Sequence, residues 1–261
     1  MPASALGTLA HHGPLARTVG DAALMLTIIA APDARDVYGW IDRAPDYRAG
    51  LEDGVAGLKI AVSPKLGWVA HVDADVAERV AAAAKVCESL GAHVDMADPD
   101  IGADAIAAWN AMWWPGMAYQ LAAFEGRPAA GSDPGLVAGA ELGGKIPATQ
   151  LIAASLKRAE LHNRMARFHA SYDLLLTPTL PLPAFEVGHL LPPAGGWGAM
   201  DRLGALQLSQ QPAASLPCGV TQRGLPVGLQ LVGAIGRDGA RASRACEAVA
   251  PFLMLEAPRQ Y

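Results

Sequence analysis

The pattern that most constrains the fold is a strand, a helix and a second strand that follow one another within residues 58–96. Residues 58–64 form a short apolar run closed by a proline, which is typical of a buried strand. Valines then recur every fourth residue within 72–90, which predicts one buried face of a helix. Residues 93–96 read as the second strand. A unit of these lengths predicts parallel pairing, because the helix provides the crossover.

The ends of this predicted helix carry their own signals. Asp73, Asp75 and Glu78 crowd the first turn, where the helix dipole favours negative charge. Gly91 follows the last apolar position and is a predicted C-cap.

Helices and strands alternate along the rest of the chain, which predicts a single layered α/β domain over residues 1–261. The expected helix at 14–31 is apolar almost throughout and is predicted to be buried on several sides. The other expected elements are helices at 103–124, 149–171 and 238–252, strands at 173–177, 213–220 and 226–232, and irregular loops at 32–56, 125–147 and 181–204.

The composition indicates a surface that is short of charge. Charged residues make up 17% of the chain and hydrophobic residues 52%, whereas charged residues usually make up about 25%. Either the core is large or some apolar surface serves a partner. The net charge of -5 argues against binding to nucleic acid or to an acidic membrane, both of which need a basic excess.

Three cysteines, Cys87, Cys218 and Cys246, are too few and too widely spaced for a disulfide framework or a metal site. We therefore expect a reducing, cytoplasmic setting. No apolar run reaches the roughly 18 residues of a membrane span, and the first residues lack the basic start of a signal peptide.

Three segments carry a resemblance to a known family. They are GPLARTVGDAA at 13–23, YDLLLTPTLP at 172–181, and QPAASLPCG with GLPVGLQLVG within 211–233. In this order they resemble the second half of amidase-signature hydrolases, and residues 57–99 are similar to the strands between the first two segments. The resemblance implies the C-terminal portion of a layered mixed sheet flanked by helices on both faces.

The resemblance also implies a reaction. Amidase-signature enzymes cleave small amides, some esters and, in one branch, glutamine for ammonia transfer. They use a serine nucleophile, a second serine in a cis peptide and a lysine. The lysine must be neutral to accept a proton through the bridging serine, and a glycine-rich turn offers N–H groups to the oxyanion. The resemblance implies a small-molecule amide substrate and neither a metal nor an organic cofactor.

The chain departs from the family at the decisive point, because it contains no Gly-Gly-Ser-Ser-Gly-Gly stretch. Gly143-Gly144 is followed by Lys145, and Gly195-Gly196 by Trp197. No lysine matches the context of the catalytic one, so no catalytic residue is assigned. We expect the catalytic residues upstream and the chain to be inactive alone. The alternative is a non-catalytic structural subunit, or an amidotransferase A-like subunit completed by a partner chain.

A second departure lies at Gln207-Leu208-Ser209-Gln210, where family members usually have Asn-Leu-Thr-Gly. Gln210 replaces a glycine and so loses the ready access to positive φ that glycine has. The resemblance therefore does not determine the local turn or the nearby pocket contacts.

Two groups of residues are candidates for the substrate-pocket wall. Thr177, Pro178 and Thr179 end a predicted strand, and sites in α/β folds gather at such ends; the alternative is a plain strand exit. Trp109, Trp113 and Trp114 cluster on a predicted helix, and rigid aromatic side chains suit an acyl pocket. For these tryptophans the alternative is core packing.

The remaining candidates favour structural roles. Arg17 and Asp21 lie one helical turn apart and are predicted to pair. Cys218 is predicted to be a buried, inert thiol, and His162 and His169 to be solvated or helix-stabilising. A Ser-His-Asp hydrolase is disfavoured because no GxSxG elbow is present.

Partners follow from the same reasoning. If an N-terminal half of the domain is missing, an apolar face or an unpaired edge strand should be exposed, and such surfaces associate. We therefore expect the missing half as a partner, or a homo-oligomer.

Overall fold

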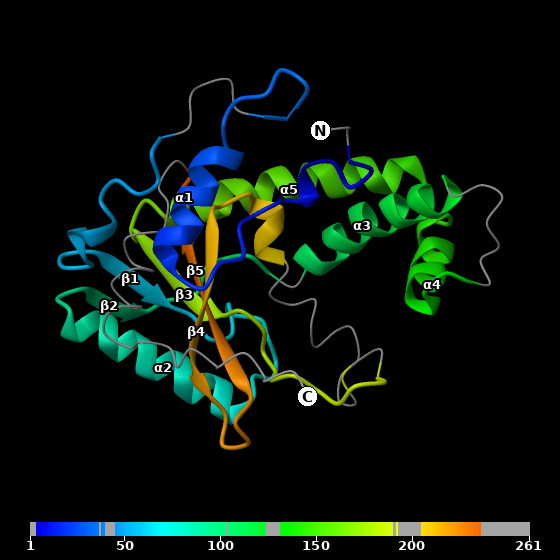
Figure 1. Ribbon diagram of the computed structural model, residues 1–261. Helices are drawn as coiled ribbons and strands as arrows, with labels where there is room; N and C mark the ends of the chain where they lie inside the picture. Colours follow the sequence, from blue (N-terminus) through cyan, green and yellow to red (C-terminus); the bar gives the residue numbers. More distant parts are fainter. Residues whose placement is uncertain are drawn as a thin grey trace, which may run out of the picture.

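A computed structural model describes residues 4–36, 38–39, 45–102, 104–123, 131–189, 192 and 205–235 (Figure 1). Its centre is a five-stranded sheet with the order β2-β1-β3-β5-β4. The strands are β1 (Lys59–Val62), β2 (His93–Met96), β3 (Leu174–Pro178), β4 (Ala213–Val220) and β5 (Pro226–Gly233). β1 pairs in parallel with β2 and β3, whereas β5 runs antiparallel to β3 and β4. The predicted mixed sheet is confirmed, as is the parallel pairing of the first two strands.

Helices cover both faces of this sheet (Figure 1). They are α1 (Val19–Ile29), α2 (Ala74–Ser89), α3 (Asp104–Ala122), α4 (Pro134–Gly143) and α5 (Ala148–Phe168). Short 3-10 turns lie at η1 (Gly7–Leu9), η2 (Leu51–Asp53) and η4 (Ala205–Ser209).

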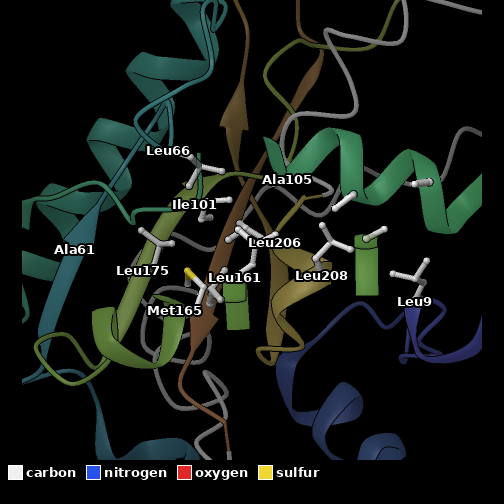
Figure 2. Close-up of a cluster of buried hydrophobic side chains, with 14 residues drawn as sticks. Leu9, Ala61, Leu66, Ile101, Ala105, Leu161, Met165, Leu175, Leu206 and Leu208 are labelled. Atoms are coloured by element: carbon white, nitrogen blue, oxygen red, sulfur yellow. The ribbon is translucent and has the colours of Figure 1, made fainter. Parts of the chain in front are cut away.

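Two apolar clusters hold the layers together, one on each face. The first lies between the sheet, α3, α5 and η4, and Figure 2 shows the side chains of Leu175, Leu161 and Leu206 converging there. The second lies between the sheet and α2 and contains Ile60, Leu176 and Val80. Leu175 and Leu176 serve opposite clusters because successive side chains of a strand point to opposite faces. We call the face toward α3 and α5 the α5 face, and the other the α2 face.

α2 forms as its sequence signals predict. The Asp73 carboxylate accepts a hydrogen bond from the Asp75 N–H at 2.9 Å and caps the first turn. Gly91 adopts φ 90° just after the helix, which completes the predicted glycine stop. The chain then enters β2, whose His93 lies beside Lys59 of β1.

The expected helix at 14–31 is shorter and more exposed than predicted. It begins at Val19 because the Thr18 hydroxyl accepts a hydrogen bond from the Asp21 N–H at 3.1 Å and caps it there. Only Val19 and Ala23 of α1 are buried. Ile28 is 67% exposed, so the prediction of burial on several sides was wrong for the described chain.

The expected irregular loop at 125–147 contains α4. The Asp133 carboxylate caps it by accepting from the Gly135 N–H at 2.8 Å. Its glycines misled the prediction, because they are contact positions. A Cβ on Gly139 would lie 2.7 Å from the Trp114 ring. The glycines therefore let α4 approach α3 closely.

The other elements follow the sequence closely. The predicted strands near 213–220 and 226–232 are confirmed as β4 and β5, and the turn between them includes Gly224 at φ 80°. The expected helix at 238–252, Cys246 and Trp197 lie outside the described residues. Within the described residues, no helix combines the length and apolar character that crossing a bilayer requires.

Candidate functional site

A row of polar side chains crosses the α5 face where the parallel strands end. Ser63 follows β1 directly, and its N–H donates to the Leu176 carbonyl at 2.9 Å, which sets it beside Thr177. Thr177 lies opposite Gln230 of β5. Gln230 in turn lies opposite Ser215 of β4. We call Ser63, Thr177, Gln230 and Ser215 the polar row.

The row follows an apolar layer on the same face. The residues two positions earlier or later on three of these strands are Ala61, Leu175 and Val232, and all three belong to the buried α5-face cluster. Because strand side chains alternate with a period of two, the row continues that layer at the carboxyl ends of β1 and β3. Ligand sites of open α/β sheets form at such ends.

The hydroxyls at the two ends of the row have defined partners. The Ser63 hydroxyl donates to an Asp98 carboxylate oxygen at 2.6 Å. The Ser215 and Thr179 hydroxyls lie 2.7 Å apart. A glycine allows this second contact, because a Cβ on Gly228 would lie 2.7 Å from the Thr179 hydroxyl.

The middle of the row contains two buried oxygen atoms without a partner among the described residues. Thr177 is fully buried, and its Oγ1 has no hydrogen-bond partner within the described residues. The same holds for Oε1 of Gln230. Leaving such an atom unpaired costs about 1–3 kcal/mol. The row therefore offers a hydroxyl and a carbonyl oxygen that can still form hydrogen bonds.

In the part of the chain that is described, no hydroxyl of the row is paired with a lysine or a histidine. The hydrogen bonds of its serines go to Asp98 and Thr179, and neither goes to a lysine or a histidine. The described residues also bring together no group of three side chains that could hold a metal ion. The arrangement can bind and orient a polar group, but it supplies no proton relay of its own.

The predicted pocket residues of β3 divide between the two faces. Thr177 and Thr179 lie on the α5 face with the polar row. Pro178 pairs with Leu229, which belongs to the α2-face cluster, so Pro178 lies on the opposite side of the sheet. Thr177 and Thr179 thus share one face of the sheet, and Pro178 lies between them in sequence but on the other face.

The three predicted tryptophans divide as well. Trp109 and Trp113 stack with ring centroids 5.1 Å apart and 16° between their planes, and both pack against the α5-face cluster. Trp114, one residue further along α3, packs against Gly139 of α4. The stacked pair forms a rigid aromatic surface on the helix that covers the α5 face.

Among the described residues, Arg17 and Asp21 form no ion pair, although the sequence predicted one. Asp21 accepts a hydrogen bond from the Thr18 hydroxyl at 2.8 Å. Arg17 is exposed and precedes the helix. The cap at Thr18, rather than a charge pair, fixes the start of α1.

Arg158 is a site residue that the sequence patterns did not indicate. This half-buried side chain of α5 donates to the Leu208 carbonyl at 3.0 Å, and to the Thr8 hydroxyl and carbonyl at 2.6 and 2.9 Å. Burial lowers the pKa of its guanidinium. It thereby ties α5 to η1 and to η4, the turn that leads into β4.

The turn after η4 keeps a left-handed residue although its glycine is absent. Gln210 adopts φ 61°, so the left-handed conformation is reached here without a glycine. Its N–H donates to the Gln207 carbonyl at 3.2 Å, and its side chain reaches the Thr8 carbonyl at 3.5 Å. These contacts compensate for the cost of positive φ in a residue that carries a Cβ.

The thiol and imidazole groups have structural surroundings. Burial raises the pKa of the Cys218 thiol to about 11, so the thiol stays protonated at neutral pH, as expected for an inert one. The ring Nδ1 of His162 lies 2.9 Å from the Ser209 carbonyl, and that of His169 lies 3.1 Å from the Tyr172 carbonyl. Both rings are half-buried and lie against backbone carbonyls, which favours the helix-stabilising role.

Some residues of the polar row could have been predicted from the sequence. Ser215 and Gln230 interrupt apolar strands at positions of the same alternation phase. Their alignment depends on the antiparallel register, which the sequence alone does not give. Ser63 and Asp98 carried no signal, because they meet only when two loops are folded.

Comparisons with known proteins all indicate one family. The family model described as Amidase matches residues 5–240. An acylamidase of Rhodococcus erythropolis is 33% identical over 258 aligned positions, which cover 93% of this chain and 53% of that protein. The A subunit of a glutamyl-tRNA(Gln) amidotransferase from Myxococcus xanthus is 32% identical and is covered to 57% of its length. The chain spans about half the length of the curated relatives it matches.

Solved structures agree with these matches. A bacterial aryl acylamidase of the amidase signature family superimposes with a TM-score of 0.79 at 29% identity, over 92% of this chain and 53% of that one. A 6-aminohexanoate cyclic dimer hydrolase superimposes with a TM-score of 0.84 at 20% identity, over 95% and 56% of the two chains. The second likeness concerns the fold alone.

Proposed function

The chain belongs to the amidase family, and on that premise we propose that it is the C-terminal part of an amidase-signature domain whose complete form hydrolyses a small or aryl amide. The observation that carries this proposal is the 33% identity to an acylamidase over 93% of the chain, with only 53% of that enzyme covered. A relative of this similarity supports the reaction class, and the partial coverage supports a domain that needs further sequence.

The catalytic relay is proposed to come from outside residues 1–261. Family members use two serines and a lysine, and the sequence has no Gly-Gly-Ser-Ser-Gly-Gly stretch. The hydrogen bonding of Ser63 and Ser215 supports this, because their partners are Asp98 and Thr179, and neither serine is bonded to a lysine as the family's relay requires. The 261 residues alone are therefore proposed to be inactive.

This chain is proposed to supply one wall of the substrate pocket. The hydroxyls of Thr177 and Thr179 offer hydrogen bonds to the polar atoms of an amide. The stacked Trp109 and Trp113 offer a flat apolar surface of the kind that binds an aryl or acyl group. Trp114 and Pro178, which were predicted with them, are proposed to support these side chains from behind.

The completed domain is proposed to reside in a reducing compartment, the cytoplasm. Cys218 is a free thiol, and such thiols persist where disulfides are not favoured. The proposed partner is the remaining part of the domain. A homo-oligomer is the second proposal, since the exposed side chains of α1 favour association of either kind.

An amidotransferase A-like subunit is the second candidate function. The 32% identity to the Myxococcus xanthus protein over 96% of this chain favours it specifically. In that case the complete protein would release ammonia from glutamine, and it would act with partner chains. The two candidates share the fold and the relay, and they differ in the amide that is cleaved.

The test compares the 261 residues alone with the same residues joined to the rest of the domain. Both are assayed with an aryl acylamide and with glutamine. We expect hydrolysis only by the complete domain, and labelling by a fluorophosphonate probe on a serine outside residues 1–261. Turnover by the isolated chain that is abolished by Ser63→Ala or Ser215→Ala would refute the proposal. Preferential release of ammonia from glutamine would select the second candidate.

A further inference from the structure

Arg158 joins two turns of the chain that are distant in sequence. Its guanidinium donates to the Thr8 hydroxyl and carbonyl of η1 at 2.6 and 2.9 Å, and to the Leu208 carbonyl of η4 at 3.0 Å. The ion pairs of α5 are made by its neighbours Lys157 and Arg164 instead. Because three N–H groups of one planar fork are used together, Arg158 fixes η1 and η4 relative to each other.

Both of these turns also support α3. Figure 2 shows Leu206 and Leu208 of η4 in the α5-face cluster, which includes Ala108 of α3. The chain that leads into η1 lies against α3 further along the helix, since a Cβ on Gly116 would lie 2.5 Å from the Leu6 Cδ2 atom. α3 therefore rests on the two segments that Arg158 holds.

α3 needs this support because its own hydrogen bonding is interrupted. Pro115 stands inside the helix and has no N–H to donate to the Ala111 carbonyl. Helices bend readily at such a proline. The course of α3 near Pro115 is therefore set by what packs against it, and Trp113 lies only two residues before that proline.

The stacked indoles of α3 depend on the same support. The rings of Trp109 and Trp113 lie with centroids 5.1 Å apart and 16° between their planes. Several rotamers are open to a side chain on a helix, so near-parallel stacking requires a surface on which both rings rest. That surface is the α5-face cluster, against which both indoles pack. Leu206 and Leu208 belong to the cluster, and Arg158 holds the turn that carries them.

We propose that Arg158 is a positioning residue for substrate binding, which keeps Trp109 and Trp113 stacked by holding the two turns that support α3. The inference rests on the proposed function in one respect, because the stacked rings are proposed there to bind an aryl or acyl group. Arg158 thereby determines the selectivity for aryl amides over short aliphatic amides, and it does so without touching the substrate.

The shape of the guanidinium group matters for this role. A lysine ammonium is a point charge and lacks the planar fork that spans the Thr8 and Leu208 oxygens. Arg158→Lys should therefore resemble Arg158→Ala more than the unaltered chain. The free guanidinium ion has the required shape, and Arg158→Ala leaves room for it between the same three oxygen atoms. Added guanidinium should therefore restore what the alanine variant loses.

Circular dichroism tests the stacking directly in this chain. Two stacked indoles give an exciton couplet in the far ultraviolet, and the difference made by Trp109→Phe in each background isolates the couplet of this pair. Arg158→Ala should remove at least half of it, and millimolar guanidinium chloride should restore it where sodium chloride does not. Arg167→Ala removes an exposed arginine of the same helix and should leave the couplet unchanged. A full couplet in folded Arg158→Ala, or an equal loss in Arg167→Ala, overturns the proposal.

Kinetics of the complete domain supply the second measurement. Arg158→Ala should raise the KM for an aryl acylamide at least fivefold and change that for a short aliphatic amide less than twofold. Equal increases for both amides would indicate a merely structural role and overturn the proposal.

A milder variant and the couplet keep the two proposals separate. If Arg158→Ala does not fold, Thr8→Val replaces it in both measurements, because it removes one acceptor of the guanidinium. An unchanged couplet and an unchanged aryl KM in Thr8→Val would then overturn the inference. Hydrolysis of neither amide by the unaltered complete domain would refute the proposed function, and the couplet would still decide whether Arg158 positions the two rings.

Discussion

Gly143 should be a position where a single added methyl group breaks the contact between α3 and α4. A Cβ there would overlap the Trp114 carbonyl oxygen and lie 2.8 Å from the Pro115 nitrogen. Both are backbone atoms, so neither can turn aside as a side chain would. Pro115 stands inside α3, and the glycine fits against the backbone at that point.

The size of the effect follows from two opposing terms. Glycine to alanine inside a helix normally stabilises by about 1 kcal/mol. Overpacking a close contact costs about 1–3 kcal/mol and occasionally more. Because the overlap at Gly143 is with backbone, we take the upper part of that range, and Gly143→Ala should be destabilising by about 1–2 kcal/mol net.

Gly20→Ala is the matched control. A Cβ on Gly20 of α1 would meet its nearest neighbour, the Thr18 hydroxyl, at 3.9 Å, which is an ordinary contact. The same change should therefore leave stability equal or raise it by about 0.5–1 kcal/mol. Urea unfolding followed by circular dichroism measures both variants, with the slope m checked for constancy. If Gly143→Ala is as stable as Gly20→Ala, the close approach of α4 to the α3 backbone is wrong.

Three further predictions concern buried polar groups. Arg158→Ala should destabilise by about 2–3 kcal/mol, because it removes three charge-assisted hydrogen bonds to Thr8 and Leu208, and Arg158→Lys should recover less than half of the loss in urea unfolding. Thr177→Val should be neutral or stabilising by up to about 1 kcal/mol, because the hydroxyl it removes is buried and unpaired, yet it should lower kcat/KM of the complete domain if that hydroxyl binds the amide. Burial holds the pKa of His169 below its usual 6.5, so the unfolded state binds more protons than the folded state in acid. The contribution of His169 to stability should therefore be complete above about pH 7.5 and be lost as the pH falls. His169→Gln should flatten that fall in thermal melts between about pH 5 and 8.

Much of the fold could be predicted because its signals are local. The strand at 58–64 is a short apolar run and the helix at 72–90 has a period-four pattern, with Asp73 as a cap and Gly91 as a stop. The errors arose where tertiary contacts determine the structure. α4 reads as a loop because its glycines allow contact with Trp114, and nothing in its own sequence shows that neighbour.

The candidate site was predictable only where one strand contains it. Thr177 and Thr179 could be proposed from the end of a single strand, and they lie on one face. Gln230 and Ser215 join them through the register of β5 with its two neighbours. A register depends on long-range pairing, which periodicity within a strand does not specify. Arg158 was missed for the same reason, since its partners at Thr8 and Leu208 are distant in sequence.

The edge of β4 and the outer side of α1 can both be explained by one requirement, the docking of a further polypeptide. Stability of the isolated chain would favour charge on the edge of β4 and polar residues on the outer side of α1, because bare edges and apolar patches promote association. Instead, β4 carries no charged residue and the outer side of α1 is aliphatic. The two places are adjacent, because Leu216 of β4 packs against the cluster that contains Val19 and Ala23 of α1. The polar row opens at the same edge, where Ser215 is exposed. A single docked body would pair the edge, bury the aliphatic side chains and reach the open end of the row. The surface that completes the fold and the surface that binds the substrate would then share β4, so a substitution there should change association and activity together.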